Sequence, residues 1–103
     1  MAALGTLTKQ SYEEVSVVVD FADELSTGEG LSTCTVTVTE KGTTTDVSST
    51  MAGTPAISGT TVSCLIKAGT TGKKYNASYR VVTDASPAQK FEADVVVKVQ
   101  DVT

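Results

Sequence analysis

The sequence contains no histidine and no tryptophan. Histidine is the commonest general base at neutral pH and the commonest metal ligand, so its absence removes most catalytic and metal-binding arrangements. No P-loop, dinucleotide fingerprint, nucleophile elbow or CxxC pair takes its place. The sequence therefore predicts neither an enzyme nor a cofactor-binding protein, and no catalytic residue or metal site is predicted.

Long apolar runs and positive charge are also scarce. No apolar stretch approaches the ~20 residues of a membrane span, and the start, MAALGTLTKQ, lacks the basic end and long apolar run of a signal peptide. The formal net charge is −4, with 8 Lys and Arg against 12 Asp and Glu. Nucleic-acid backbones are bound by clustered Lys and Arg, so nucleic acid is not expected as a partner. Because no apolar stretch is long enough, a membrane is not expected either.

Cysteine is limited to Cys34 and Cys64, which is too few for a disulfide framework. Both alternate with apolar residues, and this pattern favours buried free thiols. An inter-strand disulfide is the alternative, and it would need an oxidising compartment. A reactive thiol is the third interpretation, although no His, Lys or Arg obviously activates either residue.

Alternation is the main pattern that the sequence does contain. Apolar residues recur at every second position in residues 34–38, 62–66, 75–81 and 91–99. A period of two places one side of a strand in a core and the other in water. With Val15–Asp20 and a short edge strand around Val47–Met51, we expect six or seven strands in two sheets.

A glycine-bounded turn, Gly69 to Lys74, precedes Tyr75 and a run of alternating residues. In immunoglobulin-like sandwiches a tyrosine at such a corner ties its strand to the preceding loop through the hydroxyl, and Tyr75 is the candidate for that role. The strand at 91–99 is expected to pair antiparallel with the Tyr75 strand, because the connection around Pro87 is short. The predicted fold is an all-β, immunoglobulin-like or fibronectin III-like antiparallel β-sandwich.

One short helix is expected near residues 21–26. Asp20 can cap it, and Asp23 lies three residues later, where a capping-box acid would sit. Phe21 and Leu25 are four apart, so they would share a face toward the core. Gly28 can supply the positive φ that ends such a turn. We interpret this segment as a short bridge between the two layers of the sandwich.

The first 11 residues show no clear period. They are predicted to form a flexible or partner-ordered N-terminal arm, followed by a single domain at residues 12–103.

Three further features have simple structural explanations. The acids Asp20, Asp23, Glu24 and Glu29 could offer oxygen ligands to Ca²⁺, but their spacing fits no EF-hand loop. The triplet Asn76-Ala77-Ser78 matches a glycosylation pattern inside an expected strand. The pair Lys73-Lys74 is typical of a solvated turn. None of these is predicted to be a functional site.

The order of several short motifs resembles a family of small bacteriophage virion proteins, described as fiber–tail adaptor or related neck and tail proteins with an immunoglobulin-like fold. The resemblance extends from about Val15 to Val99. Phe21 stands where the family often has tryptophan, and the loop Ala85-Ser86-Pro87 replaces a glycine-containing hairpin. The matching residues are Asp20-Phe21-Ala22-Asp23, Leu25, Gly28-Glu29-Gly30-Leu31-Ser32, Val36, Val38, Ile57-Ser58-Gly59, Val62, Gly69, Gly72, Tyr75 and Val82-Thr83-Asp84.

The resemblance implies a structural protein of a tailed-phage virion, acting as an assembly adaptor at the neck, tail or fibre through protein–protein contacts. Its expected partners are connector, tail or fibre subunits, in a homo-oligomeric ring or array, after synthesis in the host cytoplasm. A capsid decoration protein is one alternative. Another is an immunoglobulin-like module that binds carbohydrate or a bacterial surface, which would need an aromatic platform from Tyr12, Tyr75, Tyr79, Phe21 or Phe91.

Overall fold

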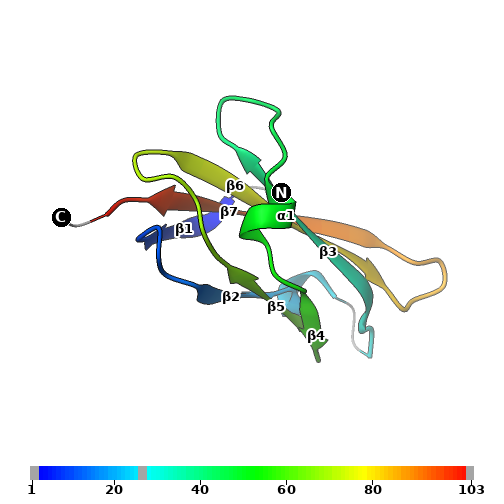
Figure 1. Cartoon of the computed structure of the whole chain (residues 1–103). Helices are drawn as coiled ribbons and strands as arrows, with labels where there is room; N and C mark the ends of the chain where they lie inside the picture. The colour runs from blue at the N-terminus through cyan, green and yellow to red at the C-terminus, as the bar shows by residue number, and fades with distance from the viewer. Residues whose placement is uncertain (1–2, 26–27, 102–103) are drawn as a thin grey trace.

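A computed structural model describes residues 3–25 and 28–101 of the chain. The described residues form two β-sheets that pack face to face, with two short helical turns at the periphery (Figure 1). In chain order the elements are β1 (Ala3–Lys9), β2 (Val15–Asp20), η1 (Ala22–Glu24), β3 (Leu31–Glu40), α1 (Ser48–Met51), β4 (Ala56–Ser58), β5 (Thr61–Ile66), β6 (Lys74–Thr83) and β7 (Lys90–Val99).

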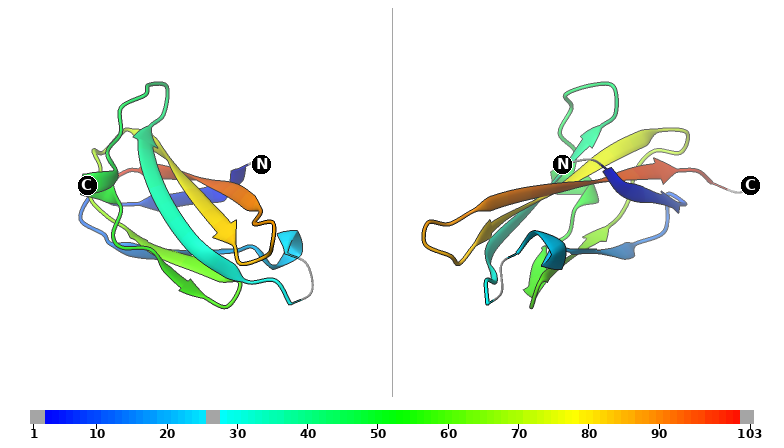
Figure 2. Two further views of the ribbon diagram at one scale, coloured as in Figure 1. Left: turned by 90° about the vertical axis from the view of Figure 1, so that its right-hand side faces the viewer. Right: turned by 180° about the vertical axis from the view of Figure 1, so that it is seen from behind.

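One sheet has four strands in the order β1-β7-β6-β3, and the other has three in the order β2-β5-β4 (Figure 2). Constant-type immunoglobulin domains place strands C, F and G in one sheet and A, B, E and D in the other. Here β3, β6 and β7 correspond to C, F and G, and β2, β5 and β4 correspond to B, E and D. The prediction of an all-β, immunoglobulin-like sandwich is confirmed.

The core lies between the sheets and is filled from both by alternating side chains. The last strand shows this most clearly, because every second residue from Ala93 to Val99 is buried while Lys98 is exposed. Burial of β-branched side chains on a pleated surface is what favours the extended backbone here. The buried apolar residues are Val19, Phe21, Val36, Val38, Met51, Val62, Cys64, Ile66, Tyr75, Ala77, Tyr79, Val81, Ala93, Val95, Val97 and Val99.

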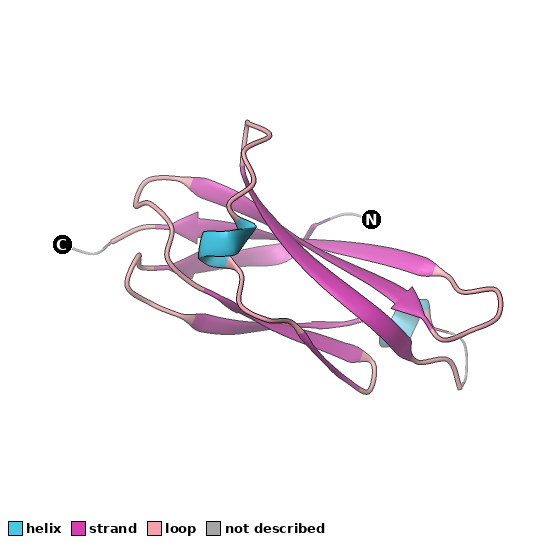
Figure 3. Cartoon of the chain, turned by 45° about the vertical axis from the view of Figure 1, so that its right-hand side comes forward, coloured by secondary structure: helices cyan, strands magenta, loops and turns pink. Residues whose placement is uncertain are grey.

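The sandwich is elongated, with principal extents of 49 × 24 × 21 Å. Strands β3, β6 and β7 have 10 residues each, whereas β2 and β5 have 6 and β4 has 3. The β6–β7 hairpin therefore reaches past the three-stranded sheet at one end (Figure 3). As predicted, β6 and β7 pair antiparallel, with Tyr75 opposite Val97.

The N-terminal segment differs from the expected arm. Residues Ala3–Lys9 form β1, which pairs in parallel with β7, so that Leu7 lies opposite Val97 and Lys9 opposite Val99. The two paired strands lie far apart in the sequence, so the residue pattern within either strand does not indicate that they pair. Because β1 lies beside β7, it occupies a position different from that of strand A, which in constant-type domains lies in the same sheet as strand B.

The prediction of an edge strand around Val47–Met51 is wrong. Residues Ser48–Met51 form the single turn α1, and the edge strand of that sheet is β4, after Pro55. Asp46 holds the start of the turn, since its Oδ1 accepts hydrogen bonds from the backbone N–H of Ser48 at 2.8 Å and from its Oγ at 2.6 Å. The turn buries Met51 in the core.

The short helix after β2 is present, although it is a single 3₁₀ turn at Ala22–Glu24. It joins β2 of one sheet to β3 of the other, which confirms its place between the layers. Of the expected span, residue 26 lies outside the described residues. Phe21 is 1% exposed, and its N–H continues the ladder by donating to the Thr60 carbonyl at 2.9 Å.

Candidate functional site

Surfaces, edges and ends are the regions of this chain to be searched for function. Within residues 3–25 and 28–101, no three His, Cys, Asp or Glu side chains gather as metal ligands would, and no helix of the described residues is long and apolar enough to cross a membrane. The aromatic side chains are mostly used in packing: Tyr75, Tyr79 and Phe21 are buried and Phe91 is half-buried. Tyr12, at 95% exposure, stands alone on the surface.

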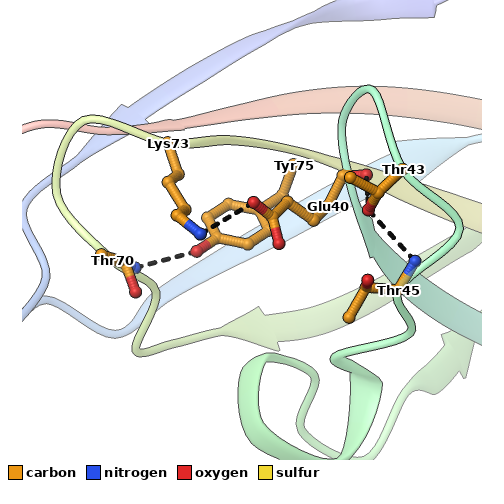
Figure 4. Close-up of polar contacts among 6 residues, drawn as sticks. All are labelled: Glu40, Thr43, Thr45, Thr70, Lys73 and Tyr75. Atoms are coloured by element: carbon orange, nitrogen blue, oxygen red, sulfur yellow. Dashed lines mark hydrogen bonds and ion pairs between the residues drawn. The ribbon is translucent and has the colours of Figure 1, made fainter.

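Tyr75 is the second residue of β6, at the corner that follows β5. Its side chain is 3% exposed, and its hydroxyl accepts a hydrogen bond of 3.0 Å from the backbone N–H of Thr70, five residues upstream (Figure 4). This is the geometry of a tyrosine corner. Beside it, Lys73 Nζ lies 2.9 Å from Glu40 Oε1, which links the corner to the end of β3. The corner therefore fixes the loop 67–73 over one end of the core.

Replacing Tyr75 by phenylalanine keeps the buried ring and leaves the N–H of Thr70 without its partner. We expect the free energy of unfolding to fall by about 1–2 kcal/mol, the usual cost of losing one part-buried hydrogen bond. Chemical denaturation followed by circular dichroism measures it. The control is Tyr12→Phe, because that exposed side chain has no core role; equal effects of the two changes would contradict a structural corner.

The opposite end of the sandwich carries residues 20–25, 28–30, 59–60 and 84–89. These segments contain Asp20, Asp23, Glu24, Glu29 and Asp84 and no Lys or Arg; we call this the acidic end. Two carboxylates tie its loops together: Asp20 Oδ1 accepts from the Ala22 N–H at 2.8 Å and the Thr60 hydroxyl at 2.9 Å, and Asp84 Oδ1 accepts from the Gly30 N–H at 2.9 Å.

The structure places the remaining residues singled out in the sequence on turns and strands. Asp23 is exposed on η1, Leu25 is half-buried after it, and Gly28 has a φ of +82°. Cys34 and Cys64 are free thiols, half-buried and buried respectively. Burial raises the pKa of both thiols, which keeps them protonated and weakly nucleophilic near neutral pH.

Two buried polar groups make hydrogen bonds that the sequence did not predict. Tyr79, on β6, is fully buried, and its hydroxyl donates to the Val17 carbonyl of β2 at 3.1 Å, so it ties the two sheets together. Lys9, at the end of β1, is 1% exposed, and its ammonium donates to the carbonyls of Ala68 and Gln10. Burial lowers the pKa of Lys9. Alternation over residues 75–81 places Tyr79 on the core side but indicates no partner for its hydroxyl, whereas Lys9 looks like an ordinary surface residue in the sequence.

Tyr79 predicts a loss of stability at alkaline pH. Burial raises the pKa of Tyr79 well above its usual value near 10, so the folded state keeps the proton that the unfolded state begins to lose. Below pH 10 both states are protonated and this group adds no pH dependence. Above it, stability should fall, by about 1 kcal/mol near pH 11.

Urea denaturation between pH 8 and 11 on the wild type and Tyr79→Phe tests this expectation. The thiols, whose pKa values are also raised, lower the stability as the pH rises, whereas Lys9, whose pKa is lowered, increases it. Both contributions are common to the two proteins, so the difference between their curves isolates Tyr79. The wild type should lose more stability than Tyr79→Phe; parallel curves would contradict the proposed titration.

The four edge strands of the two sheets differ in how they are protected. β4 has only three residues and follows Pro55, and β1 has a register irregularity between Ala3 and Gly5. One half of β3 is covered by the chain after it, because the Val47 N–H donates to the Val38 carbonyl and the Val38 N–H to Ser48 Oγ, both at 2.8 Å. Shortness, proline, bulges and covering loops are the usual protections of an edge.

β2 has none of these protections. Its six residues pair with β5 in unbroken register from Val15 to Asp20, and no described strand pairs with its other side. The sequence VSVVVD contains no proline and no lysine, and Val18 is 58% exposed. In constant-type immunoglobulin sheets strand A shares the sheet of strand B, at the edge beside it. None of the described strands occupies that position here, so this edge of β2 is unpaired.

An apolar groove of about 360 Å³ runs between the edges of β1 and β2. Its lining comes from Gly5 to Leu7 of β1, Val15 to Val19 of β2 and Val95 of β7. We call it the edge groove. Its floor is aliphatic, and its charged neighbours are Glu13 and Glu14 before β2 and Asp20 at the end of β2, all exposed. Strands β1 and β2 contain one Lys or Arg, Lys9, and its side chain is buried.

Comparison with known protein families gives a match over most of the chain. Residues 9–98 match the family described as Podophage GP4 fiber-tail adaptor protein gp77. No curated protein matches the chain. The matched region begins at the last residue of β1 and ends one residue before the end of β7, so it takes in both sheets, the tyrosine corner and the acidic end. The chain belongs to the podophage fiber-tail adaptor family gp77.

Proposed function

We propose that this chain is a structural component of the podophage virion that attaches fibre protein to the tail, and that it acts by binding rather than by catalysis. Family membership across residues 9–98 is the observation that carries this proposal. The structure supports it: the core is closed, the aromatic residues are largely buried, and the features left on the surface are strand edges and loops.

An adaptor must offer separate surfaces to at least two neighbours. The elongated sandwich provides them, because the acidic end and the tyrosine corner lie at opposite ends of a body 49 Å long. The free edges of β2 and of the first half of β3 belong to different sheets. Head-to-tail contacts between copies generate closed rings when the rotation closes, so we further propose a homo-oligomeric ring or array in the particle, assembled after synthesis in the host cytoplasm.

Electron microscopy of particles tests the proposed function. A phage with a stop codon in this gene, grown in cells that do or do not supply the wild-type chain, should yield particles with fibres only when the chain is supplied. Particles without the chain should retain heads and tail bodies. Normal fibres on particles that lack the chain, or the absence of the chain from purified complete particles, would reject the adaptor role.

A further inference from the structure

The free edge of β2 is the surface whose chemistry is most specific. The direction of its unpaired groups follows from the ladder with β5. The Phe21 N–H donates to the Thr60 carbonyl, and Phe21 and Thr60 continue the register of β2 with β5. Because antiparallel partners alternate between bonded and non-bonded pairs, the N–H groups of Val15, Val17 and Val19 face β5. Those of Ser16, Val18 and Asp20 face outward.

The side chains beside that edge define a second requirement. Val17 and Val19 point inward and line the edge groove together with Leu7 and Val95. Val18 points outward and is 58% exposed. A strand laid along this edge would therefore place alternate side chains in an apolar groove and the others on the surface, where Val18 offers one lateral contact.

Charge decides against a second copy of β2 as the occupant. In an antiparallel pair of two β2 edges centred on Val17 and Val18, Glu13 and Glu14 of one chain would approach Asp20 of the other. Like charges facing each other across strands are destabilising. No lysine or arginine lies in β2 to offset them. The same carboxylates attract a segment that has cations at its ends.

We propose that the free edge of β2 accepts an extended segment of a tail or fibre protein as an added strand, in the position of an immunoglobulin A strand. The segment has alternating apolar residues that fill the edge groove and Lys or Arg at its ends, beside Glu14 and Asp20. Backbone hydrogen bonds to Ser16, Val18 and Asp20 hold it, and the groove selects its side chains. This inference rests on the adaptor function proposed above, for which it names one contact.

A synthetic peptide tests the chemistry without the native partner. The probe is the fluorescein-labelled peptide Lys-Val-Thr-Val-Thr-Val-Lys, titrated with the folded chain and followed by anisotropy. Two peptide controls share its composition of apolar residues: one has Glu in place of both Lys, and one carries N-methyl groups at alternate positions along a single edge. Binding of the first peptide, with at least about tenfold weaker binding of both controls, is expected.

Protein variants locate the contact. Val18→Pro removes an outward N–H while leaving the bonds to β5 in place, because proline is tolerated on an edge whose N–H faces away from the ladder. It should weaken binding of the Lys-flanked peptide about tenfold or more. Val18→Thr keeps the N–H and loses only apolar contact, so about a twofold loss is expected. Glu14→Lys should weaken the Lys-flanked peptide and strengthen the Glu-flanked one.

The N-methylated peptide keeps the test decisive even if Val18→Pro does not fold. No binding of the Lys-flanked peptide up to about 1 mM, or equal binding of its N-methylated form, overturns the proposal. In particles, folded Val18→Pro should fail to restore fibres where Val18→Thr restores them. Full restoration by Val18→Pro overturns the strand contact while leaving the adaptor role intact. Particles that keep their fibres without any copy of the chain reject the adaptor role itself, and the peptide titration then decides on the edge.

Discussion

Replacement of Gly69 by alanine is expected to lower the free energy of unfolding by about 3–5 kcal/mol, a large fraction of the total stability of a domain of this size. Gly69 has a φ of +96°, where a side chain is strained. An added Cβ would also lie 2.7 Å from Cγ2 of Val99, 3.1 Å from Cε of Met51 and 3.5 Å from Cε2 of Tyr75. Val99 and Tyr75 are buried in the core and in the tyrosine corner, so these two side chains cannot move away easily.

Gly72 provides the matched control for this change. It lies in the same loop with a φ of +87°, but a Cβ placed there meets nothing within 4 Å. Gly72→Ala should therefore cost only the backbone strain, about 1–2 kcal/mol. Urea denaturation of both variants measures the difference, which reports the steric term alone. Equal losses for the two would contradict the packing of Gly69 against the core.

Replacement of Phe21 by alanine is expected to cost about 3–5 kcal/mol, the usual range for a fully buried aromatic side chain. Phe21 is 1% exposed and lies where β2 leaves its sheet, so its ring closes the core at the acidic end. The loss combines the buried area of the ring with the cavity left between two sheets that are held apart by other side chains.

Phe91 provides the comparison for Phe21, because it has the same chemistry and is only half-buried at the start of β7. Phe91→Ala should lose clearly less stability than Phe21→Ala, in proportion to its smaller buried area. Thermal and urea denaturation of both variants, on the same preparation, measure the ratio. A larger loss for Phe91→Ala would mean that the end of the core lies elsewhere.

The strands that the sequence predicted well are those with strict alternation. In β7, Ala93, Val95, Val97 and Val99 are all buried, and the short connection from β6 led to the correct antiparallel partner. The hydrogen bond of Tyr75 to its loop followed from the glycine turn before it. In these regions local propensity and tertiary packing agree, which is why reading the sequence succeeded.

β1 could not be found in the same way. Lys9, the last residue of β1, faces inward but is charged, so it breaks the apolar alternation that would mark a strand. Its burial is possible because its ammonium donates to the carbonyls of Ala68 and Gln10. Its partner β7 lies at the other end of the chain, and a parallel pairing between distant segments leaves no local signal.

The segment around α1 was misinterpreted for a different reason. Val47 and the threonines near it favour an extended backbone, yet the hydrogen bonds of Ser48 to Asp46 and to the Val38 N–H select a turn.

The free edge of β2 could not be predicted from the sequence either. Whether the edge of a strand is paired depends on the order of strands in the sheet, and alternation within one strand does not encode it.

A cryo-electron microscopy reconstruction of the tail, at a resolution that separates strands, shows whether β2 receives a strand from a neighbour. We expect this sandwich at the junction of tail and fibre, with an extended segment of a neighbouring protein running along β2 over Val17 and Val19. A sandwich at that junction whose β2 edge faces open solvent would contradict the strand contact. A junction built without this chain would contradict both the strand contact and the adaptor role.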